Sequence, residues 1–338
     1  MLKFVVILLL VCLHEIHSSC PPSFILQPCS CIEHSRSQTT IICEDLHQSS
    51  FDLRASFVQF SSYQKFVSNQ THFDDFLLSN TSVRELPENV FGKITFTTLR
   101  FRNNLQLTTI NRHAFRSFAD QIEVFETLNS NLSDTTTIFF ILQQFRNLRY
   151  LSLQNDRLKF IPSYAFNHTN LTHIYFGFEQ VEQSQPIERI GAYAFYNLPN
   201  LQFLRIFSPY LRTIDKYAFA QRYRFNRESM LELYLGGKML HSTSFPVTSL
   251  TRFRNRFVFL RFYNTSLTYF DEQVFQPFLE ANPSSLLDIN SSNRLFQCDC
   301  RSAWIQFDYF KHRDQLENRV YGYPCWDYHF PSNCTTYQ

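Results

Sequence analysis

The sequence predicts an α/β solenoid, in which short parallel strands stack side by side between two cysteine-rich ends. One short apolar pattern returns about every 23 to 30 residues along the chain, a period that is typical of solenoids. The cysteines lie on either side of this repeated region and never inside it. The chain of 338 residues contains 38 Phe and only 6 Gly, so bulky aromatic side chains are expected to fill the space between the strands and the outer loops.

Residues 1–19 are expected to form a signal peptide that is removed. Lys3 precedes an apolar run over 4–13, and the small residues Ser18 and Ser19 come just before Cys20. This run is too short to span a bilayer, although a buried first strand or helix is the alternative. No later stretch is long and apolar enough for a membrane span, and the polar C-terminus lacks a lipid-anchor tail. We therefore expect a secreted, extracellular protein.

Eight cysteines remain once Cys12 has left with the signal peptide. An even number in a secreted chain favours disulfides over the zinc site that four thiolates could also form. A solenoid needs terminal caps, because its ends would otherwise expose apolar surface, and disulfides can hold such small caps together. The two groups are Cys20, Cys29, Cys31 and Cys43 before the repeats, and Cys298, Cys300, Cys325 and Cys334 after them.

The N-terminal cap is expected to span residues 20–72 and to contain one short helix. Residues 44–72 show no clear repeat, but Ser50 is followed by Leu53, Phe57 and Phe60 at helical spacing. This segment is predicted to lie under the first strand of the stack.

About eight repeats are predicted over residues 73–285, followed by a closing strand around Ile289 and a C-terminal cap over 286–338. In one copy, Leu148, Leu151 and Leu153 form the strand, and a Tyr-Ala-Phe triplet closes the repeat at 164–166. Side chains alternate inward and outward along such strands, which are expected to form one parallel sheet on the concave side. The register of the third repeat, 122–145, is left open. The inward anchors are Phe76, Leu99, Phe125, Leu151, Ile174, Leu204, Leu233 and Leu260.

The closing segments are expected to pack as a stack of phenylalanines on the convex side. The extra residues of the longer repeats, 180–186, 221–229 and 243–256, are assigned to loops. The closing pairs are Val90-Phe91, Ala114-Phe115, Ala165-Phe166, Ala194-Phe195, Ala218-Phe219 and Val274-Phe275.

The whole mature chain resembles extracellular leucine-rich-repeat proteins, both in these repeats and in the segment from Asn293 to Trp304, which is similar to the start of their C-terminal cap. The resemblance implies a horseshoe with a parallel concave sheet and disulfide-bonded caps. By the same resemblance the cap cysteines would pair as Cys20–Cys31, Cys29–Cys43, Cys298–Cys325 and Cys300–Cys334.

A narrower resemblance is to arthropod secreted proteins related to the non-catalytic, leucine-rich-repeat subunit of oplophorus luciferase. It rests on Cys29-Ser30-Cys31, on Cys43-Glu44-Asp45, on the expected helix and on Phe73-Asp74-Asp75-Phe76. This resemblance implies a binding or stabilising partner of another protein and not light-producing chemistry.

The concave face is the leading candidate binding site, because its outward positions become aromatic and basic from the fourth repeat onward. Earlier outward positions are polar, as at Thr97, Thr98, Arg100 and Arg102. Exposed Tyr, Phe and Arg are common anchors of protein interfaces, although a chain rich in Phe could also place them there without function. The predicted site residues are Tyr150, His173, Tyr175, Phe203, Arg205, Phe207, Tyr234, Phe259, Arg261 and Tyr263.

Eight N-x-S/T sequons in a chain with a signal peptide predict that several carry glycans at the surface. Glycans on Asn264 and Asn290 would shield one end of the concave face and leave repeats four to seven to a partner. The sequons begin at Asn69, Asn80, Asn131, Asn167, Asn170, Asn264, Asn290 and Asn333.

A second candidate site is a basic rim formed before repeats seven and eight, which could bind a sulfated glycan or another polyanion. The secretory route argues against nucleic acid, and a solvated loop with scattered ion pairs to Glu228 and Glu232 is the alternative. The arginines are Arg222, Arg224, Arg227, Arg252, Arg254 and Arg256.

Catalytic chemistry has no support in the sequence. The glycines form no nucleophile elbow, dinucleotide fingerprint or phosphate loop. The histidines at 113, 168, 173 and 241 are isolated in different repeats and show no spacing of metal ligands. We expect no enzyme activity, no cofactor and no metal. The sequence thus predicts a secreted glycoprotein that binds another extracellular protein; the alternatives are a matrix or sulfated-glycan-binding protein and a non-catalytic subunit of a secreted, luciferase-like enzyme complex.

Overall fold

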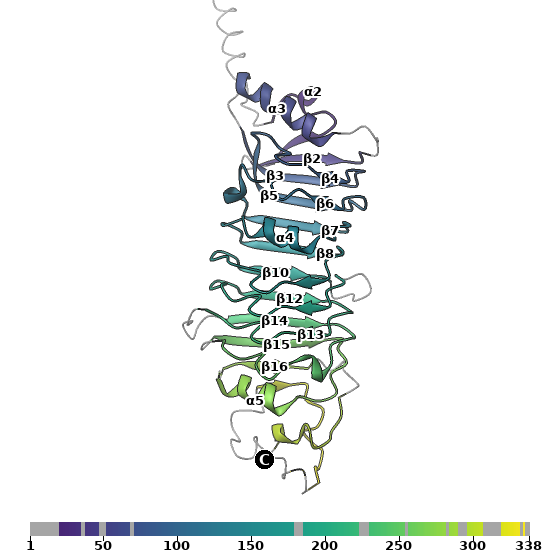
Figure 1. The fold of residues 1–338 in the computed structure, drawn as a ribbon, viewed down its shortest axis with the longest axis vertical. Coiled ribbons are helices and arrows are strands. Elements are labelled where there is room, and N and C mark those ends of the chain that lie inside the picture. The colour runs from purple at the N-terminus through teal and green to yellow at the C-terminus, as the bar shows by residue number, and fades with distance from the viewer. Residues whose placement is uncertain are drawn as a thin grey trace, which may run out of the picture.

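The chain folds into an elongated stack whose strands lie across its long axis (Figure 1). The predicted signal peptide, the sequons at Asn69, Asn290 and Asn333, and Arg224, Arg227 and Arg254 lie outside the described residues. The computed structural model describes residues 20–34, 38–46, 52–67, 71–178, 185–222, 230–253, 256–281, 284–289, 296–306, 319–331 and 334.

The N-terminal cap contains two helices and a hairpin. Helix α2 (Ser23–Leu26) precedes the antiparallel strands β1 (Ser30–His34) and β2 (Gln38–Glu44), and disulfides join Cys20 to Cys31 and Cys29 to Cys43. Helix α3 (Leu53–Val67) confirms the predicted helix and buries Phe57 and Phe60. Asp52 caps this helix, because its Oδ1 accepts a hydrogen bond of 3.0 Å from the amide of Ala55. Ser50 lies outside the described residues.

A 12-stranded sheet runs the full length of the stack, and every pairing after the β1–β2 hairpin is parallel. The eight predicted anchors are confirmed, because Phe76, Leu99, Phe125 and the five that follow are paired in register across neighbouring strands. The third repeat therefore has a defined register through Phe125. The repeat and closing strands are β3 (His72–Ser79), β5 (Thr95–Arg102), β7 (Val124–Leu128), β8 (Tyr150–Gln154), β10 (His173–Phe176), β12 (Phe203–Phe207), β14 (Met230–Gly236), β15 (Phe257–Tyr263), β16 (Leu286–Asp288) and β17 (Val320–Tyr321).

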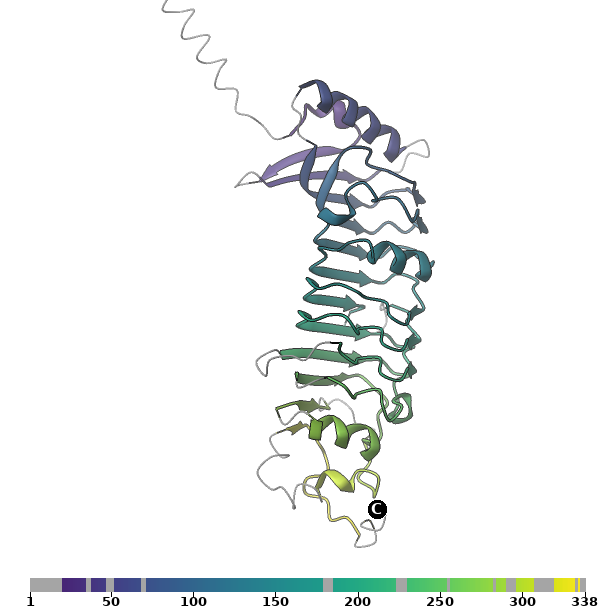
Figure 2. The same ribbon diagram turned by 60° about the vertical axis from the view of Figure 1, so that its left-hand side comes forward.

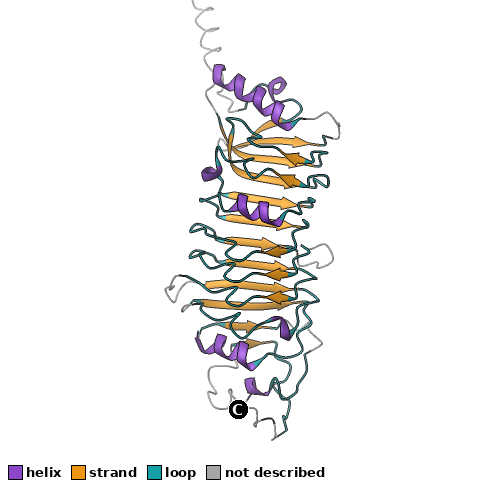
Figure 3. Cartoon of the chain, viewed as in Figure 1, coloured by secondary structure: helices purple, strands orange, loops and turns teal. Residues whose placement is uncertain are grey.

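Turns, short strands and short helices form the other side of the stack (Figures 2 and 3). Because the sheet occupies one side alone, its outward surface, called here the sheet face, is the face that the sequence predicts as concave. The elements opposite it are β4 (Glu85–Leu86), β6 (Thr109–Ile110), η1 (Ala119–Gln121), α4 (Thr135–Leu142), β9 (Phe160–Ile161), β11 (Arg189–Ile190), β13 (Thr213–Ile214), η3 (Ser242–Ser244) and α5 (Glu272–Ala281).

The predicted phenylalanine stack exists, but it is interrupted. Phe195 stacks on Phe219 with ring centroids 5.7 Å apart, and on Phe166 at 5.5 Å. Phe139 of helix α4 packs against Phe166 in a T-shaped arrangement, with ring centroids 5.6 Å apart, in place of a further stacked ring. The final pair, with Phe275, lies in helix α5 instead of a turn. These buried rings hold neighbouring repeats together.

A second ladder marks the ends of the strands. Asn80, Asn103, Asn129 and Asn155 all have a left-handed backbone, with φ between 52° and 55°. Asparagine tolerates this conformation better than most residues, which explains its recurrence at this turn. The side-chain amides of Asn129 and Asn155 each donate a 2.7 Å hydrogen bond to the asparagine of the preceding repeat. The ladder therefore keeps successive strand ends aligned.

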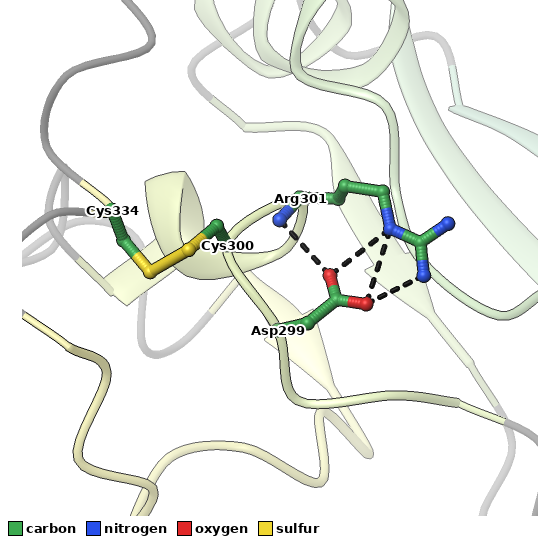
Figure 4. The surroundings of a disulfide bond; sticks show 4 residues. All are labelled: Asp299, Cys300, Arg301 and Cys334. Atoms are coloured by element: carbon green, nitrogen blue, oxygen red, sulfur yellow. Dashed lines mark hydrogen bonds and ion pairs between the residues drawn. A yellow bond between two sulfur atoms is a disulfide. The ribbon is translucent and has the colours of Figure 1, made fainter.

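The C-terminal cap closes the other end with the disulfides Cys298–Cys325 and Cys300–Cys334, so that all four pairs in the structure match the resemblance. Next to the second disulfide, the carboxylate of Asp299 accepts hydrogen bonds from the guanidinium and the backbone amide of Arg301 (Figure 4). Among the described residues, no helix combines the length and the apolar character needed to cross a membrane.

Candidate functional site

Nine of the ten predicted site residues are partly exposed on the sheet face. They occupy alternate positions of β8, β10, β12, β14 and β15, so they follow directly from the anchor register. These nine are Tyr150, His173, Tyr175, Phe203, Arg205, Tyr234, Phe259, Arg261 and Tyr263.

An aromatic row crosses the middle of this surface. Tyr150, His173 and Phe203 are register partners on three neighbouring strands. The His173 ring stacks on Phe203 with centroids 4.8 Å apart and on Tyr150 at 6.1 Å, and Tyr175 lies 5.4 Å from Tyr150. Burial among these rings lowers the pKa of His173 and raises the pKa of Tyr175. At neutral pH the row is therefore an uncharged aromatic surface.

Arg205 lies beside this row and among aromatic rings. Its guanidinium carbon is 5.5 Å from the ring centroid of Tyr175, 5.5 Å from that of Phe207 and 5.1 Å from that of Tyr234. Cation–π attraction of this kind holds a guanidinium in place while leaving one side of it accessible. The residue is partly exposed, although its Nε is buried.

Tyr234 connects Glu232, on its own strand β14, to Arg261 on the neighbouring strand β15. Its hydroxyl donates a 2.5 Å hydrogen bond to Glu232 and accepts a 3.0 Å bond from Arg261. The Nε of Arg261 lies 3.3 Å from a carboxylate oxygen of Asp288, and its guanidinium carbon is 4.0 Å from the ring centroid of Phe259. Burial raises the pKa of Tyr234. These contacts fix the side chains before any partner arrives, which reduces the entropy lost on binding.

Phe207 corrects the sequence prediction. It stands at an outward position in register with Gly236, yet it is completely buried. Its ring fills the space above Gly236 and reaches Tyr263, with centroids 5.7 Å apart. Arg205 covers it from the other side. Phe207 therefore supports the binding surface from below and cannot be one of its contact residues in this conformation.

Carboxylates also belong to this face, although the predicted site included none. Glu126, Glu232 and Asp288 occupy outward positions that the anchor register already defines, but the predicted site consisted of aromatic and basic residues. Toward the N-terminal end, Arg100 lies between Asp75 at 2.7 Å and Glu126 at 3.2 Å. The early strands are thus covered by ion pairs, whereas the later ones combine rings with fixed charges.

Of the three arginines of the predicted basic rim that the structure describes, one is buried. Arg256 is only 1% exposed, and burial lowers its pKa to about 10, so it is not available to a polyanion. Its guanidinium lies in the interior, 3.4 Å from the carbonyl oxygen of Met230. Arg252 and Arg222 remain exposed, and the guanidinium carbon of Arg252 lies 4.4 Å from the ring centroid of Tyr217.

The described sequons differ in accessibility. Asn80, Asn167 and Asn264 are exposed, and Asn264 directly follows Tyr263 at the edge of the sheet face. Asn131 and Asn170 are partly buried, and each side-chain amide donates a hydrogen bond to a neighbouring repeat. The amide of Asn80 also donates a hydrogen bond, of 2.5 Å to Asp45, so exposure alone makes the first three better placed to accept a glycan.

No group of three or more His, Cys, Asp or Glu side chains in the described part of the chain could hold a metal ion. The isolated His168 is buried, with Nε2 2.8 Å from the carbonyl oxygen of Leu142, and its pKa is lowered by burial. Its contacts serve packing between repeats.

Comparison with known proteins agrees with this architecture. The model of the BspA-type leucine-rich-repeat region matches six copies over residues 61–184 and 176–278, which is more than half of the chain. A relative from Oplophorus gracilirostris, the non-catalytic subunit of Oplophorus-luciferin 2-monooxygenase, is 21% identical over 304 residues. This alignment covers 85% of the present chain and 79% of that subunit.

Proposed function

The chain belongs to the BspA-type leucine-rich-repeat family, and from this premise we propose that it is a secreted glycoprotein that binds another extracellular protein through its sheet face. The observation that carries the proposal is the fixed cluster of Tyr175, Arg205, Tyr234 and Arg261 on adjacent strands. Clustered Tyr and Arg residues at the centre of a patch are frequent energetic anchors of protein interfaces.

Extracellular location is supported by four disulfides, which persist in oxidising compartments, and by the signal-like N-terminal sequence. The exposed sequons Asn80, Asn167 and Asn264 support glycosylation in that compartment. Disulfide formation and N-glycosylation both take place in the secretory pathway, so the two observations support the same location.

The partner class is suggested by the relative from O. gracilirostris, a non-catalytic subunit of a monooxygenase. We infer that the present chain also lacks catalytic activity and serves another protein, such as the enzyme subunit of a secreted complex. The sheet face supports this role, because its charged groups are held in pairs or against rings and form no acid–base or nucleophile pair aimed at a substrate.

The test is affinity purification of the native secreted protein, followed by comparison of two triple variants. Replacing Tyr175, Phe203 and Tyr234 with Ser is expected to abolish capture of the co-eluting partner. The matched control replaces three exposed aromatic residues that are not among the predicted site residues, Phe160, Tyr210 and Tyr328, with Ser. Secretion of both variants at normal levels shows that they fold. Unchanged capture by the sheet-face variant, or purification of the native protein as a lone polypeptide, would exclude the proposal.

A further inference from the structure

Four tyrosines form a ladder on the side of the stack opposite the sheet face. Tyr164, Tyr193 and Tyr217 hold the same place in three consecutive repeats, and their rings stack with centroids 5.2 Å and 5.3 Å apart. Tyr196 turns its ring edge to Tyr193 at 5.4 Å and to Tyr164 at 6.2 Å. We call these four residues the tyrosine ladder. It was not among the predicted sites, because the Tyr-Ala-Phe triplet was assigned to packing alone.

Three residues of the tyrosine ladder have an unfavourable backbone conformation. Tyr164, Tyr193 and Tyr217 have φ of 52°, 55° and 55°, a left-handed conformation that is unfavourable for a bulky side chain. In an earlier repeat Asn89 holds the same place at φ 50°. The Ala and Phe of each triplet are buried in the core, whereas Tyr164 is 56% exposed and Tyr193 and Tyr217 are partly exposed. Strain retained at an exposed residue is a reason to look for function.

The ladder lies in a region of positive charge. The guanidinium of Arg252 extends the stack at 4.4 Å from the Tyr217 ring, and the amide of Arg222 donates a 2.8 Å hydrogen bond to the carbonyl of Tyr196. Lys216 precedes Tyr217 and is exposed. Asp215 is the one carboxylate within residues 163–166, 192–196 and 215–222, and its carboxylate is bound by the guanidinium of Arg189. These three segments therefore contain more basic than acidic residues.

We propose that the tyrosine ladder, together with Lys216, Arg222 and Arg252, is a second docking surface that binds a sulfated polysaccharide. The rings offer apolar edges and hydroxyl groups to sugar units, and the cations offer hydrogen-bond donors to sulfate groups. The ladder follows the axis of the stack over three repeats, so a linear chain with repeated anionic groups can contact every step. This surface is distinct from the sheet face and does not depend on the protein partner proposed above.

A polysaccharide fits this surface better than an acidic peptide does. Extended peptides usually dock by adding a strand to a free backbone edge. Here the amides of the ladder turns already bond to the next repeat, from Tyr164 to Ala192, from Tyr193 to Tyr217 and from Tyr217 to Thr248. The surface thus offers side chains at a regular spacing, which favours a ligand recognised by its repeated groups.

The test measures retention of the full secreted chain on immobilised heparin, with chemically desulfated heparin as the competing probe. One variant combines Lys216→Ala, Arg222→Ala and Arg252→Ala; the other replaces Tyr164, Tyr193 and Tyr217 with Asn, the residue that tolerates this backbone at Asn89. Each variant is expected to bind heparin about tenfold to a hundredfold more weakly, because three exposed contacts are removed at once.

Several results would overturn the proposal. These are passage of the wild-type chain through heparin at low salt, equal retention of the variants, equal competition by desulfated heparin, or tighter binding of polyglutamate than of heparin. The sheet-face variant Y175S/F203S/Y234S should retain heparin binding, so the two surfaces can fail independently. Loss of heparin binding in that variant would place the polyanion site on the sheet face and also contradict the proposal.

Discussion

The ring of Phe207 lies directly above Gly236, with its Cδ1 atom only 2.3 Å from the position that a Cβ atom on Gly236 would occupy. The glycine thus makes room for the aromatic ring that supports the binding surface. Gly236→Ala is expected to destabilise the fold by about 1–3 kcal/mol, because an added methyl group overpacks this contact. Denaturant unfolding measures the loss.

A double-mutant cycle separates this contact from other effects of the substitution. Phe207→Ala removes the ring, so G236A should cost less in the F207A background, with a coupling energy of about 1 kcal/mol or more. Strictly additive effects would show that the clash is with the carbonyl oxygen of Tyr263, which lies 2.8 Å from the same position.

Tyr234→Phe is expected to loosen the binding surface with little loss of ring packing. The change removes the hydroxyl that joins Glu232 to Arg261, which should lower the free energy of unfolding by about 0.5–1.5 kcal/mol. It should also weaken partner capture, because Arg261 loses one of its supports. Tyr210→Phe, in an exposed turn outside the sheet strands, is the matched control. Equal effects of the two substitutions on capture would contradict a specific role for the Tyr234 hydroxyl.

Asp156 predicts a pH dependence of stability. It is fully buried between repeats, accepts hydrogen bonds from Thr127 and Gln185, and burial raises its pKa from 3.8 to about 7. The folded state therefore holds a proton that the unfolded state has released. This stabilisation is fully present below about pH 4 and is lost as pH rises through about 7, by up to about 4 kcal/mol.

Asp156→Asn tests this linkage, because the amide cannot ionise. Unfolding measured between pH 4 and pH 8 should lose most of its slope in the variant, and the variant should be the more stable protein at pH 8. Parallel pH profiles for wild type and variant would mean that Asp156 is not the titrating group.

The C-terminal cap should depend on its covalent links. Replacing Cys298 and Cys325 with Ser opens a loop with a sequence separation of 27 residues and is expected to cost about 3–4 kcal/mol. The predicted readout is a lower unfolding midpoint and reduced secretion. Restored stability on adding Cys300→Ser and Cys334→Ser would contradict a stabilising role for the cap disulfides.

The repeats and their register could be predicted from the sequence, because every inward position of a strand must hold an apolar side chain. An anchor such as Leu151 or Leu204 must be apolar and must recur at the period of the stack, so the eight anchors and their register could be predicted. Cap helix α3 followed from the spacing of Phe57 and Phe60, although its capping residue did not, since Ser50 and Asp52 are both good caps.

The site was harder to predict, because exposure depends on neighbours from other repeats. Alternation places Phe207 outward, and only the pairing with Gly236 shows that its ring folds down and is buried. Arg256 lies in a segment that was assigned to a loop, and its burial follows from contact with Met230 of the preceding strand. The tyrosine ladder was missed for the same reason, since three separate triplets become one surface only after stacking.

The hairpin at the N-terminal end has a consequence for assembly. Strand β1 runs against all the other strands and forms one edge of the sheet, whereas the opposite edge is the two-residue strand β17. A fibre can grow when the edge strand at one end of a molecule pairs with the edge strand at the other end of the next molecule. Here an antiparallel edge meets a short parallel one, so copies placed end to end do not continue the same hydrogen-bond pattern. Within the part of the chain that the structure describes, the two edges of the sheet therefore differ in both direction and length, which disfavours end-to-end growth through the sheet.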